Sequence, residues 1–248
     1  MSGGMYLAAA GALVQQLRLE VLSNNVANIN TTGYKSDRSI FQIPEGTESQ
    51  VFETPVEGIQ TLSPYAPPFS TEIDFSQGAL RQTGNTLDVA INGDGFFSIQ
   101  TPDGVQYTRQ GSFTLDAEGV LVTPDGFPVL GEGGNITMEE GTVEIDTEGG
   151  VYVNGDEVDR LQITDFLDRG SLKKAGNGRF IAPEAAARAE RPDGTTVNQG
   201  HLETANVNPV QAMTEMIETS RAFEAYQKVI QSADEATAKS INDVGKTI

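Results

Sequence analysis

The sequence predicts an α+β protein in which a central all-β domain, of the barrel or sandwich type, is inserted between two terminal helices that form a coiled-coil-like helical domain. Three observations support this prediction. Apolar residues recur every three or four positions at both ends of the chain. The middle consists of short apolar segments separated by Asp-Gly and Asn-Gly pairs. The net charge is close to zero at both ends, whereas the middle is strongly acidic.

These patterns divide the chain into four parts. Residues 1–40 hold the first helix and a polar loop of the helical domain, and residues 205–248 hold the second helix. Residues 84–204 form the β domain. Residues 41–83 are expected to be an irregular connection, because five prolines between positions 44 and 68 interrupt any long regular element.

The first helix is expected from about Gly4 to Asn28. Its apolar stripe consists of Leu7, Ala10, Val14, Leu17 and Val21. The start resembles the apolar core of a signal peptide. However, no basic region precedes it and an amphipathic helix continues it, so we expect this segment to be retained in the mature protein, without cleavage.

Residues 23–34, "SNNVANINTTGY", are polar but uncharged. One interpretation is local: Asn and Thr end the helix, and Gly33 allows the turn that follows. The other is that the asparagines bond between identical subunits, because carboxamides donate and accept without like-charge repulsion. The two interpretations are compatible.

The β domain is predicted from its turns. Asn92-Gly93, Asp94-Gly95, Asp103-Gly104, Glu118-Gly119 and Asp125-Gly126 separate the short segments. Glycine at these positions supplies the positive φ that tight turns need. Regularly spaced turns with no helical pattern between them indicate an all-β domain.

The second helix has a well-defined start. Asn208 suits the N-cap, Pro209 the first helical position and Gln211 the third, in a capping-box-like arrangement. An apolar stripe then continues toward the C-terminus. The stripes of the two helices either pack on each other within one chain or pack on other subunits.

Composition excludes several functions. The chain of 248 residues has a net charge of −19, nearly all of it in the middle, which disfavours nucleic-acid binding. It contains no cysteine, and no apolar run is long enough to span a membrane. No cofactor or metal site is expected, since the Asp/Gly-rich stretches lack calcium-loop spacing. The single histidine, His201, is assigned to a turn or surface, and Arg81 and Arg109 to the solvated surface.

Three blocks of the sequence resemble the flagellar rod and hook family of axial proteins. They are "LSNNVANINTTGYKSDRSIFQ", the stretch from "GNTLDVAINGDGFF" to "VTPDGFPVLG", and "LETANVNPVQAMTEMIETSRAFEAYQKVIQSADE". The blocks cover more than half of the chain in family order. Within the family, the overall length, "ANVNPVQAM" and "RAFEAYQKVIQSADE" are most similar to the proximal-rod type, with the distal-rod type as the near neighbour.

The resemblance implies a non-enzymatic structural subunit of the flagellar basal body that supports motility. Such proteins pass through the flagellar type III export apparatus without a cleaved signal, and assemble in the periplasm with copies of themselves and with other rod proteins. Two other classes stay open: a secreted β-domain binding module oligomerised by its end helices, and a hydrolase using loop carboxylates. The sequence pairs no two acids for the latter.

From the stripes and the polar segment we predict a set of subunit-interface residues. They are Leu7, Val14, Leu17, Val21, Ser23, Asn24, Asn25, Asn28, Asn30, Thr31, Thr32, Gly33, Tyr34, Asn208, Met213, Ile217, Phe223, Tyr226, Ile230 and Ile241.

Overall fold

The computed structural model describes residues 3–41, 69–184, 186, 188–189 and 194–245. They form two compact units. The helical unit contains the described parts of residues 1–27, 37–72 and 208–248, and the β unit contains those of residues 28–36 and 73–207. The α+β class is therefore confirmed. Most of the predicted irregular connection lies outside the described residues, and the predicted domain boundaries stay predictions.

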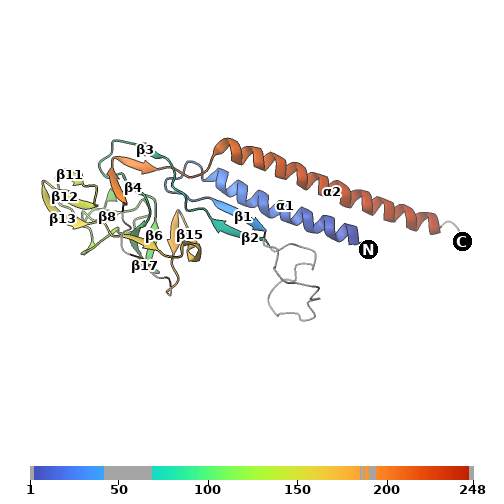
Figure 1. The fold of residues 1–248 in the computed structure, drawn as a ribbon, viewed down its shortest axis with the longest axis horizontal. Helices are drawn as coiled ribbons and strands as arrows, with labels where there is room; N and C mark the ends of the chain where they lie inside the picture. Colours follow the sequence, from blue (N-terminus) through green and yellow to red (C-terminus); the bar gives the residue numbers. More distant parts are fainter. Residues whose placement is uncertain (1–2, 42–68, 185, 187, 190–193, 246–248) are drawn as a thin grey trace. The chain divides into compact units, whose positions relative to one another are not determined.

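The helical unit contains α1 (Gly3–Ala27) and α2 (Pro209–Gly245), with the short strands β1 (Asp37–Phe41) and β2 (Phe69–Ile73) paired to each other. Figure 1 shows α1 and α2 side by side and running in opposite directions. The side chains of Ala8, Ala10 and Ala12 are buried. Gly11, which has no side chain, lets the Tyr226 ring of α2 approach α1 closely, and the helices pack on each other within one chain.

The start of α2 follows the predicted chemistry. The side-chain oxygen of Asn208 accepts hydrogen bonds from the backbone N–H groups of Val210 (3.1 Å) and Gln211 (3.3 Å). These contacts satisfy two donors that a helix start leaves unpaired. The side chain of Gln211 donates to Glu215 in the next turn, at 2.9 Å. Asn208 is therefore confirmed as the N-cap, while Gln211 supports the following turn.

The β unit is built from short strands. They are β3 (Leu80–Gln82), β4 (Val89–Asn92), β5 (Phe96–Thr101), β6 (Gly104–Thr108), β7 (Thr114–Leu115), β8 (Leu121–Val122), β9 (Leu130–Gly131), β10 (Gly134–Asn135), β11 (Val143–Ile145), β12 (Gly150–Val153), β13 (Asp156–Arg160), β14 (Ile163–Phe166), β15 (Lys173–Gly176), β16 (Arg179–Ile181), β17 (Arg188–Ala189), β18 (Thr196–Gln199) and β19 (His201–Glu203). A single turn of 3₁₀ helix covers Arg169–Ser171.

The largest sheet has the order β15-β16-β6-β5-β14-β17, and its neighbouring strands are antiparallel. A second sheet has the order β11-β12-β13. The predicted turn glycines have positive φ, for example +107° at Gly93 and +83° at Gly126. The turn chemistry read from the sequence is therefore confirmed, whereas closure into a barrel or sandwich stays a prediction.

Strand β5 separates two apolar clusters. Phe97 and Ile99 point into the larger one, where Phe97 meets Phe113 edge-on with ring centroids 5.1 Å apart. Phe96 points the other way and packs against Phe180, at 5.6 Å. Because both faces of β5 are buried, this strand reads as a nearly continuous apolar run rather than an alternating one.

An ion pair in the β unit, between Arg169 and Asp165, should make stability depend on pH in the acidic range. Arg169 donates two hydrogen bonds to Asp165, at 2.9 and 2.7 Å. Partial burial raises the pKa of Asp165, but the bonds from Arg169 outweigh it, so the pKa lies below its usual 3.8. Because the folded pKa is the lower one, the stabilisation is present above pH 3.8 and is lost as the pH falls through the folded value.

We therefore expect Asp165→Asn to lower the free energy of unfolding by about 1.5–3 kcal/mol at pH 7, the usual worth of bonds to a charged group. The difference from the unmodified protein should shrink below pH 3.8. Urea unfolding at a series of pH values measures both. Glu148→Gln is the control, since Glu148 forms an exposed pair with Arg160 at 3.2 Å. A constant difference down to pH 2.5 would contradict the assignment.

Candidate subunit interface

A line of apolar side chains is exposed along the first turns of α2. Val210, Met213 and Ile217 are spaced by three and four residues and expose 73%, 53% and 55% of their surface. This spacing places them on one face of the helix. Single exposed apolar residues are ordinary, but a continuous apolar line indicates a contact surface. We call these three residues the α2 stripe.

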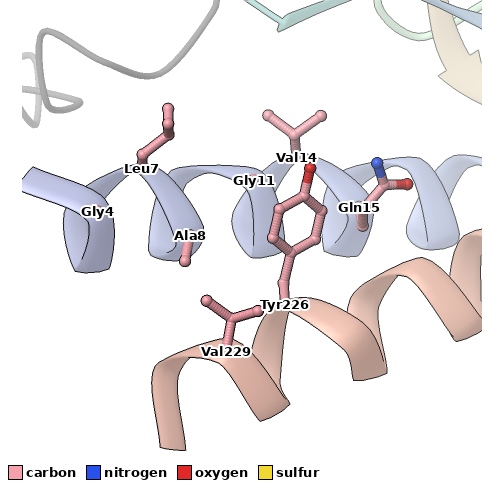
Figure 2. A pocket seen from close by; sticks show the side chains of 8 residues that line it. All are labelled: Gly4, Leu7, Ala8, Gly11, Val14, Gln15, Tyr226 and Val229. Atoms are coloured by element: carbon pink, nitrogen blue, oxygen red, sulfur yellow. The ribbon is translucent and has the colours of Figure 1, made fainter. Parts of the chain in front are cut away.

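A groove lies between α1 and α2 within the helical unit, with a volume of about 480 Å³. Its walls are largely apolar and include Leu7, Val14, Tyr226 and Val229 (Figure 2). Figure 2 shows the ring of Tyr226 standing against α1 at Gly11. A Cβ atom at Gly11 would lie 2.5 Å from that ring, so glycine is what allows this close approach. Leu7 and Val229 remain exposed at the groove.

The predicted stripe residues thus take two different positions. Val14 is buried, and Leu17, Val21, Phe223, Tyr226 and Ile230 are partly buried. Leu7, Met213 and Ile217 are exposed. Ile241 lies within α2, but its side chain is outside the described residues. Part of each stripe is therefore used between the two helices of one chain, and part faces outward.

The asparagine-rich segment is held largely by contacts within the chain. The carboxamide of Asn25, which is buried, donates to the backbone oxygen of Asp37 (2.8 Å) and accepts from its N–H (2.9 Å). The side chain of Asn28 accepts from the Thr31 hydroxyl at 3.3 Å. Gly33 has a φ of +67°. The Asn28–Thr31 bond and the Gly33 turn are those of the local, helix-ending interpretation, whereas the Asn25 carboxamide holds the start of β1, twelve residues away.

The remaining predicted residues of this segment differ in exposure. Tyr34 and Gly33 are buried and Thr32 is partly buried, whereas Ser23, Asn24 and Asn30 are exposed. A role between subunits stays a prediction for the segment. The exposed residues are the ones through which it can act.

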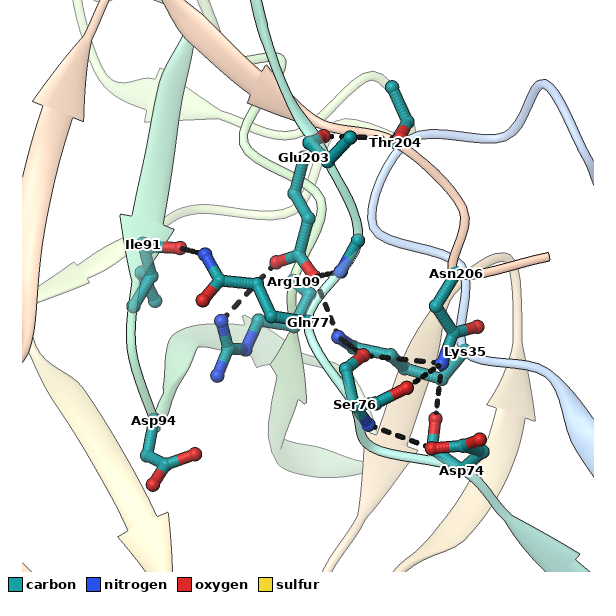
Figure 3. A network of polar contacts seen from close by, with 12 residues as sticks. Lys35, Asp74, Ser76, Gln77, Ile91, Asp94, Arg109, Glu203, Thr204 and Asn206 are labelled. Atoms are coloured by element: carbon teal, nitrogen blue, oxygen red, sulfur yellow. Dashed lines mark hydrogen bonds and ion pairs between the residues drawn. The ribbon is translucent and has the colours of Figure 1, made fainter. Parts of the chain in front are cut away.

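Beside this segment lies a polar network with a buried ionic centre that the sequence did not reveal, shown in Figure 3. We call it the junction cluster; its members are Lys35, Asp74, Ser76, Arg109, Glu203 and Asn206. The Glu203 carboxylate lies 2.6 Å from the Lys35 ammonium and 3.2 Å from the Arg109 guanidinium. It also accepts from the N–H of Gly78, at 2.9 Å.

Three of its charged side chains are buried, with 1% of Lys35, 1% of Glu203 and 4% of Arg109 exposed. The assignment of Arg109 to the solvated surface was therefore wrong. Burial lowers the pKa of Lys35 and of Arg109, and the Glu203 carboxylate opposes that shift without cancelling it. Arg109 also donates to the Gly93 carbonyl oxygen at 2.7 Å and stacks on the Phe96 ring.

Other candidate chemistry stays peripheral. His201 lies at the start of β19, with Nδ1 2.8 Å from the Gln199 carbonyl oxygen. In the part of the chain that the structure describes, no three His, Asp or Glu side chains gather as metal ligands would. Nor does any helix there combine the length and apolar character that a membrane span requires.

Comparison with known proteins gives matches along most of the chain. Residues 5–35 match the family described as flagella basal body rod protein. Residues 90–153 match the flagellar hook protein FlgE/F/G D1 domain, and residues 198–243 match the flagellar basal body rod FlgEFG protein C-terminal family.

Individual relatives extend these matches to nearly full length. FlgG, the flagellar basal-body rod protein of Buchnera aphidicola subsp. Acyrthosiphon pisum, is 36% identical over 258 residues, which cover 96% of this chain and 98% of that one. The FlgF proteins of Caulobacter vibrioides and Rhizobium meliloti are 31% and 32% identical, with 99% of both chains covered in each case.

Proposed function

The chain belongs to the family of flagellar basal-body rod proteins, and from this membership we propose how it assembles and where in the rod it lies. Like these relatives, it is a structural subunit of the bacterial flagellar basal body, and it is not an enzyme. Its partners are other components of the rod.

We propose that the exposed α2 stripe packs on a neighbouring subunit. A contact in which the stripe of one copy meets a different surface of the next copy is heterologous, and such contacts repeat into an open helical array. The apolar groove beside Leu7 is a suitable surface to receive it, because both are apolar and uncharged. Ser23, Asn24 and Asn30 then lie at the polar margin of the contact, where neutral amides avoid repulsion between repeated subunits.

The proposed position in the rod is proximal, as for FlgF. Alignment with the FlgF protein of Rhizobium meliloti extends over 251 residues and 99% of both chains, close to the 248 residues here, so few insertions are needed. The alternative is the distal position of FlgG, which the higher identities of 34–36% to the Buchnera proteins favour. The two positions are distinguished by expressing this protein in place of FlgF in one strain and in place of FlgG in another, and by imaging the rods of both strains.

For the route, we propose export through the flagellar type III apparatus into the periplasm, with α1 retained. The rod-protein match includes residues 5–35, and the side chains of α1 pack on α2. A segment that was cleaved off could not contribute this packing to the mature subunit. Mass spectrometry of subunits purified from basal bodies reads the N-terminus directly. A subunit that begins after residue 27 would contradict this proposal.

The contact surface is tested by charge. Met213→Glu combined with Ile217→Glu should abolish motility of a strain whose own gene is replaced, since two desolvated carboxylates would enter an apolar contact. The free subunit should unfold within about 0.5 kcal/mol of the unmodified protein, because both side chains are exposed.

Two control variants accompany this test. Met213→Leu with Ile217→Leu keeps the apolar surface, and Gln211→Glu adds a negative charge at an exposed position of the same turns that lies off the face of the stripe. Both should remain motile. Full motility of the Met213→Glu, Ile217→Glu strain would remove the α2 stripe from the interface. Failure of the unmodified gene to restore motility would contradict the function itself.

A further inference from the structure

The chain passes between the two units four times, at 27–28, 36–37, 72–73 and 207–208. The segments of the β unit that adjoin these crossings are bonded directly to each other. The N–H of Gly33 donates to the Glu203 oxygen (2.8 Å), and the N–H of Asn206 donates to the Tyr34 oxygen (3.3 Å). The N–H of Asp74 donates to the Ser36 oxygen at 2.8 Å. The crossings are therefore fastened together within the β unit.

The side chain of Asn206 adds a second set of connections. Its oxygen accepts from the N–H of Ser36 at 2.8 Å, and its nitrogen donates to the carbonyl oxygens of Asp74 (2.7 Å) and Ser76 (3.2 Å). One carboxamide thus joins three segments that are far apart in sequence. The ammonium of Lys35 makes a parallel connection, to the Ser76 oxygen at 2.8 Å and to Glu203.

We propose that Lys35, Glu203 and Asn206 are positioning residues for assembly, which hold these crossings in one register and so fix the spacing between the end of α1 and the start of α2. The inference rests on the proposed assembly role and explains how the subunit presents its helices for it. The end of α1 and the start of α2 are about 180 residues apart in sequence, and closing a flexible loop of that length costs conformational entropy. A folded β unit with bonded crossings removes that cost.

The chemistry of the cluster suits a register-setting role. A buried ion pair contributes little net stability compared with apolar packing, but losing one partner is costly. If one crossing segment slipped by a residue, a buried charge would be left without its partner. The ionic contacts therefore penalise wrong registers more strongly than apolar contacts of the same size, which tolerate rearrangement.

The test measures the spacing of the helices in the free, full-length subunit. The chain has no cysteine, so cysteines introduced at the exposed positions Ala9 and Ala225 carry two nitroxide labels alone. We expect one narrow interlabel distance by pulsed electron resonance, and at least a doubling of its width in Asn206→Ala and in Lys35→Met. A second label pair at Ala117 and Val158, inside the β unit, should not change in either variant.

Gln199→Ala is the matched control. The Gln199 carboxamide also donates to two backbone oxygens, those of Thr86 and Val143, both at 3.0 Å, but it joins no crossing. The Gln199→Ala variant should keep the narrow distribution of distances between the labels on α1 and α2. The proposal is overturned if Asn206→Ala and Lys35→Met leave that distance narrow, if Gln199→Ala broadens it equally, or if the unmodified subunit is already broad. Because the free subunit is measured, these outcomes are independent of whether the strain is motile.

Discussion

Replacing Gly33 by alanine should destabilise the β unit by about 3 kcal/mol. Gly33 has a φ of +67°, which costs an alanine about 1 kcal/mol. A Cβ atom there would lie 2.4 Å from the backbone carbon of Arg109 and 2.6 Å from its oxygen, and backbone cannot rotate away as a side chain can. Such overpacking adds roughly 1–3 kcal/mol. Urea unfolding followed by tyrosine fluorescence measures the loss.

Gly84→Ala separates the two contributions. Gly84 also has a positive φ, +77°, but a Cβ atom there meets nothing within 4 Å. This variant should lose only the conformational part, about 1 kcal/mol. Equal losses at the two positions would show that the contact of Gly33 with Arg109 is not the reason why glycine is needed.

Features whose contacts lie close together in the sequence could be predicted, whereas features built from residues distant in the sequence could not. The bounds of α1 and α2, the cap at Asn208 and the turn glycines depend on neighbours within about four residues, so local chemistry predicts them. The helix-ending role of Asn28 and the turn at Gly33 belong to the same class.

The junction cluster could not be read in this way. Lys35 and Glu203 are 168 positions apart, and Arg109 is separated by 94 positions from Glu203. Taken alone, Arg109 just after β6 looks like an ordinary solvated side chain, which is why it was misassigned. Only the pairing of the crossing segments brings these charges together. The same holds for the side chain of Asn25, whose partner belongs to β1 rather than to its own helix.

In the junction cluster, we expect the smaller of two chemical changes to cause the larger loss of stability. Glu203→Gln replaces one oxygen by nitrogen, yet it removes the buried carboxylate that pairs with both Lys35 and Arg109. We expect a loss of about 3–5 kcal/mol in the free energy of unfolding, as for other buried pairs that lose one partner. Lys35→Met removes a whole charged group but leaves the Glu203–Arg109 pair intact. Its loss should be about 1–2 kcal/mol, the worth of the hydrogen bonds given up.

The pH dependence of the Glu203→Gln variant identifies the cause. Burial holds the pKa of Lys35 below 10.5, so between the folded pKa and 10.5 the unfolded chain binds more protons and stability rises with pH. Without the carboxylate of Glu203, which raises that pKa, the window widens toward neutral pH. The loss of unfolding free energy caused by Glu203→Gln should therefore shrink between pH 7 and 10. The same substitution should cost less free energy in a protein that already carries Lys35→Met. A deficit that is independent of pH and of Lys35 would mean that lost packing, rather than uncompensated charge, destabilises the variant.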